Sequence, residues 1–130
     1  SKMPKFIAKD INGKVVNNLT FQGKDIVIIN IWAAWSYESL DIQRALSDAV
    51  KAGKIAAMGI CIDANPKEVR QSLERDGIEF PNVCDGKLLN TPLLKTFGLY
   101  TVPDNIVIRN GKVTERNITA NTIRQRYGTD

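Results

Sequence analysis

The chain has 130 residues and a net charge of +4; 43% of its residues are hydrophobic and 25% are charged, as in ordinary globular proteins. Its length fits one domain, residues 1–130, and its lysines and arginines form neither a dense basic run nor a stripe with interleaved aromatic residues, which argues against nucleic-acid binding. Histidine is absent, which excludes Ser-His and Cys-His nucleophile pairs and the usual zinc ligand sets, and we expect neither a metal nor a cofactor.

The first segments of the chain predict a small hairpin and a core strand. The start, residues 1–4, is not a signal peptide, and we expect an expression scar or a cut inside a longer protein. Residues 6–11 and 15–21 form two short extended pieces around Asn12-Gly13, a strong turn signal. Residues 26–32 are nearly all β-branched, which is typical of a strand buried on both faces. The apolar run ends after about ten residues, so we expect no membrane insertion.

Helices and strands alternate in the middle of the chain. From Leu40 the apolar residues follow a helical spacing that ends near Gly53, and residues 55–62 predict a second buried strand. Asn65-Pro66 predicts the start of the next helix, with asparagine as N-cap and proline at the first helical position. That helix runs to Gly77.

The last third of the chain predicts an antiparallel end to the sheet. Residues 79–83 are a brief extended piece, and Thr91-Pro92 opens a short helix that ends at Gly98. Residues 105–108 and 112–118 flank Asn110-Gly111, a hairpin signal, and residues 119–127 form a closing amphipathic helix. This order requires a mixed sheet, with parallel strands joined by helices and an antiparallel hairpin at the end.

Several motifs stand in a recognisable order along the chain. Trp32-Ala-Ala-Trp35 ends the core strand, residues 59–63 belong to the next core strand and 80–85 to the short strand after it, and Val102-Pro103 stands alone before the hairpin. This order resembles the thioredoxin fold, and more narrowly the extracytoplasmic thiol-disulfide oxidoreductases of the TlpA/ResA type, relatives of the alkyl hydroperoxide reductase/thiol-specific antioxidant family. The resemblance covers nearly the whole chain and implies a three-layer α/β sandwich with a mixed sheet and an added N-terminal β-hairpin.

The chain departs from that family at the active-site motif. Where the family has Cys-X-X-Cys, directly after Trp35, this chain has Ser36-Tyr37-Glu38-Ser39. The family's reaction needs a thiolate at the first position and a second thiol that resolves the mixed disulfide. A helix N-terminus contributes about 1 kcal/mol, which is too little to make a serine alkoxide available at neutral pH. Whether the chain is an enzyme therefore stays open.

Two interpretations of Ser36 and Ser39 follow. In the first, Ser36 is a helix N-cap, Glu38 lies in the first helical turn, and the domain is a redox-inactive module that binds a peptide or protein. In the alternative, the serines replace the cysteines of an engineered Cys-Tyr-Glu-Cys parent, which would be a thiol-disulfide oxidoreductase.

The expected binding surface follows from the resemblance. It implies a cis peptide bond before Pro103 and an extended edge for a substrate peptide beside the motif. The predicted surface consists of Trp35, Tyr37, Glu38, Val102 and Pro103. The resemblance alone implies a periplasmic or otherwise extracytoplasmic location, and the oligomeric state stays open.

The two cysteines, Cys61 and Cys84, lie at none of the family's catalytic positions. Each falls near the end of a short strand, and the fold allows these strands to be neighbours. We interpret the cysteines as small buried apolar residues. A disulfide between them requires Cα atoms about 4.4–6.8 Å apart, and redox chemistry through this pair is a third hypothesis.

Overall fold

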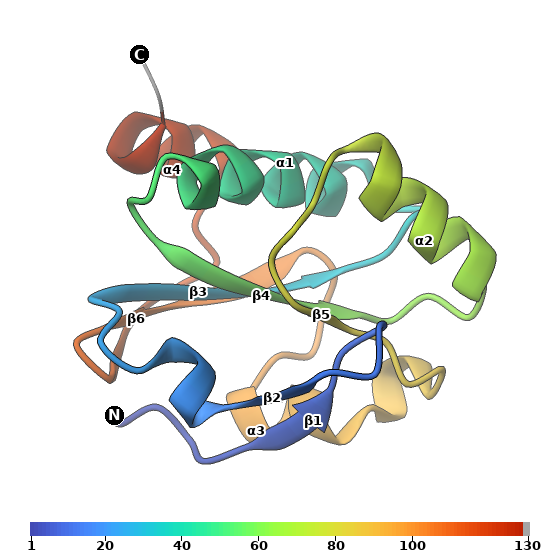
Figure 1. Cartoon of the computed structure of the whole chain (residues 1–130), viewed down its shortest axis with the longest axis horizontal. Coiled ribbons are helices and arrows are strands. Elements are labelled where there is room, and N and C mark those ends of the chain that lie inside the picture. Colours follow the sequence, from blue (N-terminus) through green and yellow to red (C-terminus); the bar gives the residue numbers. More distant parts are fainter. Residues whose placement is uncertain (129–130) are drawn as a thin grey trace.

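A five-stranded mixed sheet with the order β5-β4-β3-β6-β7 forms the middle layer of the computed structural model, which describes residues 1–128 (Figure 1). The last two residues of the expected domain 1–130 therefore lie outside the described part. β3 is parallel to β4, β4 is parallel to β5, and β6 is antiparallel to both β3 and β7. The strands are β3 (Ile26–Trp32), β4 (Ala56–Cys61), β5 (Asn82–Val83), β6 (Asp104–Arg109) and β7 (Lys112–Arg116).

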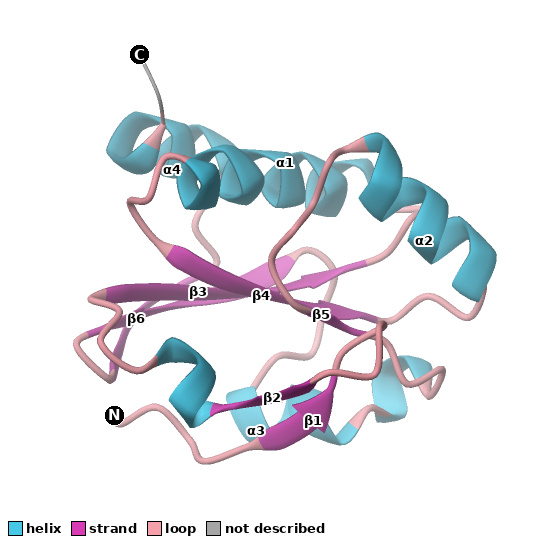
Figure 2. Ribbon diagram, viewed as in Figure 1, coloured by secondary structure: helices cyan, strands magenta, loops and turns pink. Residues whose placement is uncertain are grey.

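Helices cover both faces of this sheet (Figure 2). One face carries α1 (Tyr37–Lys51), α2 (Pro66–Arg75) and α4 (Ala120–Tyr127). The other face carries α3 (Pro92–Phe97) and the added hairpin of β1 (Ile7–Lys9) and β2 (Val15–Asn17). The predicted three-layer architecture with an N-terminal hairpin is confirmed.

The predicted helix starts are confirmed by their caps. The Ser36 Oγ atom accepts a hydrogen bond from the Ser39 N–H, with 3.4 Å between the heavy atoms. The Asn65 side chain accepts from the Lys67 and Glu68 amides, and Thr119 accepts from the Thr122 amide. Each cap satisfies amide groups that the first turn of a helix leaves without a partner, so these boundaries were visible in the local sequence.

Several extended segments are shorter than predicted: of residues 6–11 only β1 is a strand, and β7 ends before residue 118. Over residues 15–21, only β2 is a strand, and the chain then enters the 3-10 turn η1 (Asn18–Phe21). The Asn17 side chain accepts from the Leu19 amide while the Thr20 hydroxyl accepts from the Asn17 amide, and this local pairing ends the strand. Over residues 79–83, only Asn82–Val83 pairs with β4. A second 3-10 turn, η2 (Leu88–Asn90), was not predicted.

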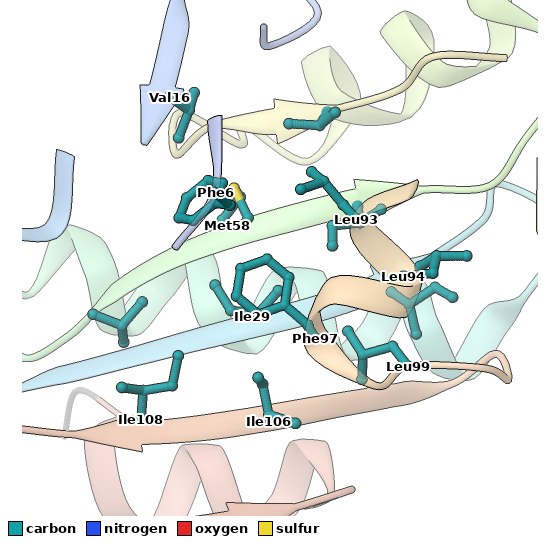
Figure 3. Packing of buried hydrophobic residues seen from close by; sticks show 14 of the residues in the cluster. Phe6, Val16, Ile29, Met58, Leu93, Leu94, Phe97, Leu99, Ile106 and Ile108 are labelled. Carbon is teal, nitrogen blue, oxygen red and sulfur yellow. The ribbon is translucent and has the colours of Figure 1, made fainter. Parts of the chain in front are cut away.

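The two faces of β3 enter two separate hydrophobic clusters. Ile29 and Ile31 pack against the hairpin and α3, where Phe6 and Phe97 meet edge to face with ring centroids 5.2 Å apart (Figure 3). Ile28 points to the other face and packs with residues of α1 and α4. The prediction that this strand is buried on both faces is therefore confirmed.

A buried amide network holds the carboxyl end of β3 in place. The Trp32 indole N–H donates to Asn82 Oδ1 at 2.8 Å, and the Gln43 amide donates to the same oxygen at 3.0 Å. Asn30 in turn donates to Gln43 at 3.1 Å. A Cβ atom at Gly59 would lie only 1.9 Å from Asn82 Oδ1, so glycine makes room for this network. The network joins β3, β5 and α1 directly beneath the site described next.

Candidate functional site

The site lies where β3 ends and α1 begins. After Trp32 the chain makes a tight turn in which the Ser36 amide donates to the Ala33 carbonyl at 3.1 Å. The Ala34 amide donates to Asp63 Oδ2 at 3.0 Å, and Asp63 lies just after the end of β4. The turn is therefore fixed both from within and from the neighbouring strand.

Ser36 and Ser39 have different surroundings. Ser36 is half-buried at the helix N-terminus, whereas Ser39 is fully buried. The Ser39 Oγ atom lies 2.9 Å from the Ser36 carbonyl oxygen and 3.3 Å from the Ala33 carbonyl oxygen, and it accepts a hydrogen bond from the Ala33 amide at 3.2 Å. Ser39 thus bonds to backbone on both sides of the turn. Both serine hydroxyls therefore bond to main-chain groups. The chain contains no histidine, so neither serine has a histidine that could act as its general base.

An open groove of about 640 Å³ lies beside the start of α1. Its walls include Tyr37, Glu38 and Asp41 from α1 and Val102 and Pro103 from the loop before β6. The structure therefore brings four of the predicted surface residues together across one groove. The Val102–Pro103 peptide bond is cis, which confirms the expectation drawn from the resemblance.

The two tryptophans of the motif separate into one core and one surface residue. The Trp32 side chain has no exposed area, while 69% of Trp35 is exposed, along with 73% of Tyr37. Trp35 does not line the groove. Its membership of the binding surface stays a prediction, although such an exposed aromatic side chain beside a groove is typical of interaction sites.

The groove wall carries two acidic side chains, Asp41 and Glu38, which differ in their ion pairing within residues 1–128. Arg124 of α4 donates to Asp41 Oδ1 at 2.6 Å, and this hydrogen bond, partly opposed by desolvation, lowers the pKa of Asp41 below its ordinary value. Within residues 1–128, Glu38 makes no ion pair. The acidic side of the groove would therefore favour a cationic ligand group at Glu38.

Sequence reasoning missed two contributors to this site. Asp63 holds the Ala34 amide, and residues 117–121 form the far wall of the groove. A signal for Asp63 was present, because a buried carboxylate directly after a core strand needs hydrogen-bond partners. No local pattern placed residues 117–121 at the groove, since they reach it only through the pairing of β6 with β7.

Cys61 and Cys84 lie on the face of the sheet that α2 covers. In the sequence, both are far from Ser36 and Ser39. Both are free thiols; Cys61 is buried and Cys84 is half-buried. They share an apolar cluster with Trp32 and Val69. The strands that precede them are neighbours, since β4 pairs with β5.

Two further features concern metal ions and membranes. Residues 1–128 contain no cluster of three or more histidine, cysteine or acidic side chains that could hold a metal ion. Over the same residues, none of the helices combines the length and apolar composition that crossing a bilayer requires.

The fold is similar to those of several solved proteins. A thiol-disulfide oxidoreductase from Bacteroides fragilis superposes with a TM-score of 0.76 at 22% identity, over 97% of this chain and 98% of the other. A thioredoxin-family thiol:disulfide interchange protein from Chlorobium tepidum gives a TM-score of 0.80 at 19% identity, over 98% and 95%. A secreted disulfide oxidoreductase from Mycobacterium tuberculosis gives 0.78 at 18% identity, over 94% and 93%.

Neither a protein-family model nor a curated protein matches the sequence. The structural likeness establishes the thioredoxin-like fold, as the sequence motifs predicted, and the proteins that share it here are described as thiol-disulfide oxidoreductases. At identities below 25%, the likeness concerns the fold, and the chemistry depends on this chain's own residues.

Proposed function

We propose that this thioredoxin-like domain is redox-inactive at its Ser36-Tyr37-Glu38-Ser39 motif and binds an extended peptide segment of a partner protein beside it. The observation that carries the proposal is the contrast between Ser39 and Tyr37. Ser39, like Ser36, has a hydroxyl bonded to backbone where disulfide exchange needs a thiol, while Tyr37 between them is 73% exposed over an open groove. The geometry of a substrate site is present without a group that can carry electrons.

The loop before β6 supports binding of an extended backbone. Within the described residues 1–128, neither the N–H nor the C=O group of Val102 makes a hydrogen bond. An extended peptide beside Val102 can pair with both groups, as in other cases where a peptide adds to an exposed edge. Tyr37 then contributes apolar contact, and Glu38 favours a lysine or arginine on the peptide.

The narrower assignment to the TlpA/ResA type and the extracytoplasmic location belong to this proposal. Their support is the order of motifs in the sequence and the description of one structural neighbour as secreted.

A second candidate function is thiol-disulfide exchange by a parent protein with cysteines at 36 and 39. One observation favours it: position 36 is half-exposed at a helix N-terminus, and position 39 is buried one turn later. That arrangement suits an attacking and a resolving thiol. The codons at positions 36 and 39 in the unmodified gene decide between the two, since cysteine codons exclude the first candidate and serine codons exclude the second.

The binding proposal is tested with a panel of extended peptides, with and without lysine or arginine, in a fluorescence anisotropy titration. For a peptide that binds, Tyr37→Ala and Pro103→Ala should each raise Kd by about tenfold, which corresponds to about 1.4 kcal/mol. Leu19→Ala is the matched control, because Leu19 is 71% exposed but lies in η1, outside the groove. Unchanged binding in both groove variants would remove this surface from consideration.

A further inference from the structure

Cys61 and Cys84 end up side by side because of the register between β4 and β5. Gly59 pairs with Asn82 and Ile60 with Val83. Continued by one position beyond these paired residues, the same register sets Cys61 opposite Cys84. Side chains alternate between the faces of a sheet, so each cysteine returns to the face that carries Asn82. Both cysteines accordingly contact the apolar cluster of Trp32 and Val69 beneath α2.

The spacing of neighbouring strands allows a disulfide between side chains on one face of a sheet. Neighbouring strands lie about 4.8 Å apart, which falls within the Cα separation of about 4.4–6.8 Å that disulfides require. Cys84 is the first residue after β5, beyond the paired positions. Both sulfurs contact the backbone of the same residue, because the Asp63 amide donates to Cys61 Sγ at 3.3 Å and the Cys84 thiol donates to the Asp63 carbonyl at 3.6 Å.

The surroundings give the two thiols different roles. Cys84 is half-buried, so a small molecule has access to it, whereas Cys61 has only 1% of its surface exposed. The hydrogen bond from Cys61, together with one from the Gly86 amide, lowers the pKa of Cys84 to about 7, although burial and the carboxylates of Asp63 and Asp85 oppose this. The same thiol–thiol hydrogen bond and burial raise the pKa of Cys61.

We propose that Cys61 and Cys84 form a redox-active dithiol, separate from the groove at Pro103, which a low-molecular-weight disulfide oxidises to an intramolecular disulfide. Cys84 is the attacking thiol and Cys61 the resolving one. Since positions 36 and 39 are serines, this pair supplies the only two sulfhydryl groups of the sequence. The proposal does not depend on peptide binding at the groove.

The reaction proceeds in two exchange steps. The Cys84 thiolate attacks one sulfur of the small disulfide, forms a mixed disulfide and releases one small thiolate. Cys61 then attacks the Cys84 sulfur, which forms the Cys61–Cys84 bond, and its proton passes to the second small thiolate as that group leaves. In total, the protein dithiol loses two electrons and two protons, and the small disulfide is reduced to two thiols.

The test uses the whole folded chain with oxidised glutathione as the oxidant. Thiol titration after denaturation should fall from the two cysteines of the sequence to none, while the intact mass shows no attached glutathione. A protease digest should contain a peptide that links Cys61 to Cys84, and dithiothreitol should restore both thiols. Cys61→Ser should instead stop at a stable glutathione adduct on Cys84, and Cys84→Ser should react at least about tenfold more slowly than the unmodified chain.

The oxidation experiment on the unmodified chain is sufficient to contradict the proposal, and it does not require the cysteine variants to fold. Retention of both thiols in the folded chain contradicts it, provided that the urea-unfolded chain is oxidised under the same conditions. A lasting glutathione adduct on Cys84 without the cross-linked peptide also contradicts it. A disulfide between two chains does so as well, because it shows that Cys61 does not resolve the intermediate.

Discussion

The Ser39 hydroxyl lies 2.9 Å from the Ser36 carbonyl oxygen, and the Ser36 hydroxyl accepts a hydrogen bond from the Ser39 amide. The two motif serines are therefore joined to each other through the first turn of α1. Ser39 also bonds to Ala33, so the pair ties the helix to the end of β3. A redox enzyme of this fold has its reactive cysteines at these two positions. In this chain the same positions hold serines that connect α1 to the end of β3.

Loss of the cap should destabilise the domain. Ser36→Ala removes the side-chain acceptor of the Ser39 amide, so the free energy of unfolding should fall by about 0.5–2 kcal/mol in urea denaturation. Ser36→Asn is the control, because asparagine also caps helices and should leave stability nearly unchanged. Equal stability of all three proteins would show that the 3.4 Å hydrogen bond has no energetic role.

Replacement of both serines by cysteine should create a redox centre. In the double variant Ser36→Cys and Ser39→Cys, the half-exposed first thiol can attack and the buried second thiol can resolve. We expect disulfide formation between the new thiols and reduction of insulin above the background of the unmodified chain. Each single variant is a control that lacks one partner and should show no sustained turnover. A folded double variant without activity would show that the motif lacks other groups that the reaction needs, in addition to the two cysteines.

Gly59 and Asn82 should be coupled in stability. Gly59→Ala places a Cβ atom against Asn82 Oδ1 and near the Trp32 indole nitrogen, at 1.9 Å and 2.8 Å without adjustment. We expect a loss of about 1–3 kcal/mol from overpacking. In an Asn82→Ala background the same substitution should cost clearly less, which a double-mutant cycle measures. Strict additivity would mean that the alanine is accommodated by some other movement.

The ion pair between Asp41 and Arg124 should make part of the stability pH-dependent. The hydrogen bond from Arg124 lowers the pKa of Asp41, so its contribution is fully present above the unfolded pKa of about 3.9 and is lost as the pH falls through the lower, folded pKa. Asp41→Asn should therefore reduce stability by at most about 1 kcal/mol at pH 7. The difference from the unmodified chain should vanish in strong acid, as followed by urea denaturation across the pH range. A difference that persists there would indicate lost packing between α1 and α4.

The order of the elements and most of their ends could be read from the sequence. Ser36, Asn65 and Thr119 bond to amides within three residues of themselves, so their effect depends on local chain geometry alone. The hairpin at Asn110-Gly111 follows in the same way from residues that tolerate positive φ angles. The absence of cysteine at positions 36 and 39 is likewise a property of the sequence, and it is enough to exclude disulfide exchange at this motif, because a hydroxyl cannot form a disulfide.

The tertiary structure decided which distant residues meet. The bond between Ala34 and Asp63 joins residues 29 positions apart, and the groove joins Tyr37 to Pro103 only because β3 and β6 pair within one sheet. The β-sheet register of Gly59 with Asn82 likewise places Cys61 beside Cys84, whereas a shift of one residue would turn one cysteine to the opposite face. Such contacts depend on long-range strand pairing and packing, whose energies cannot be inferred from any local run of residues.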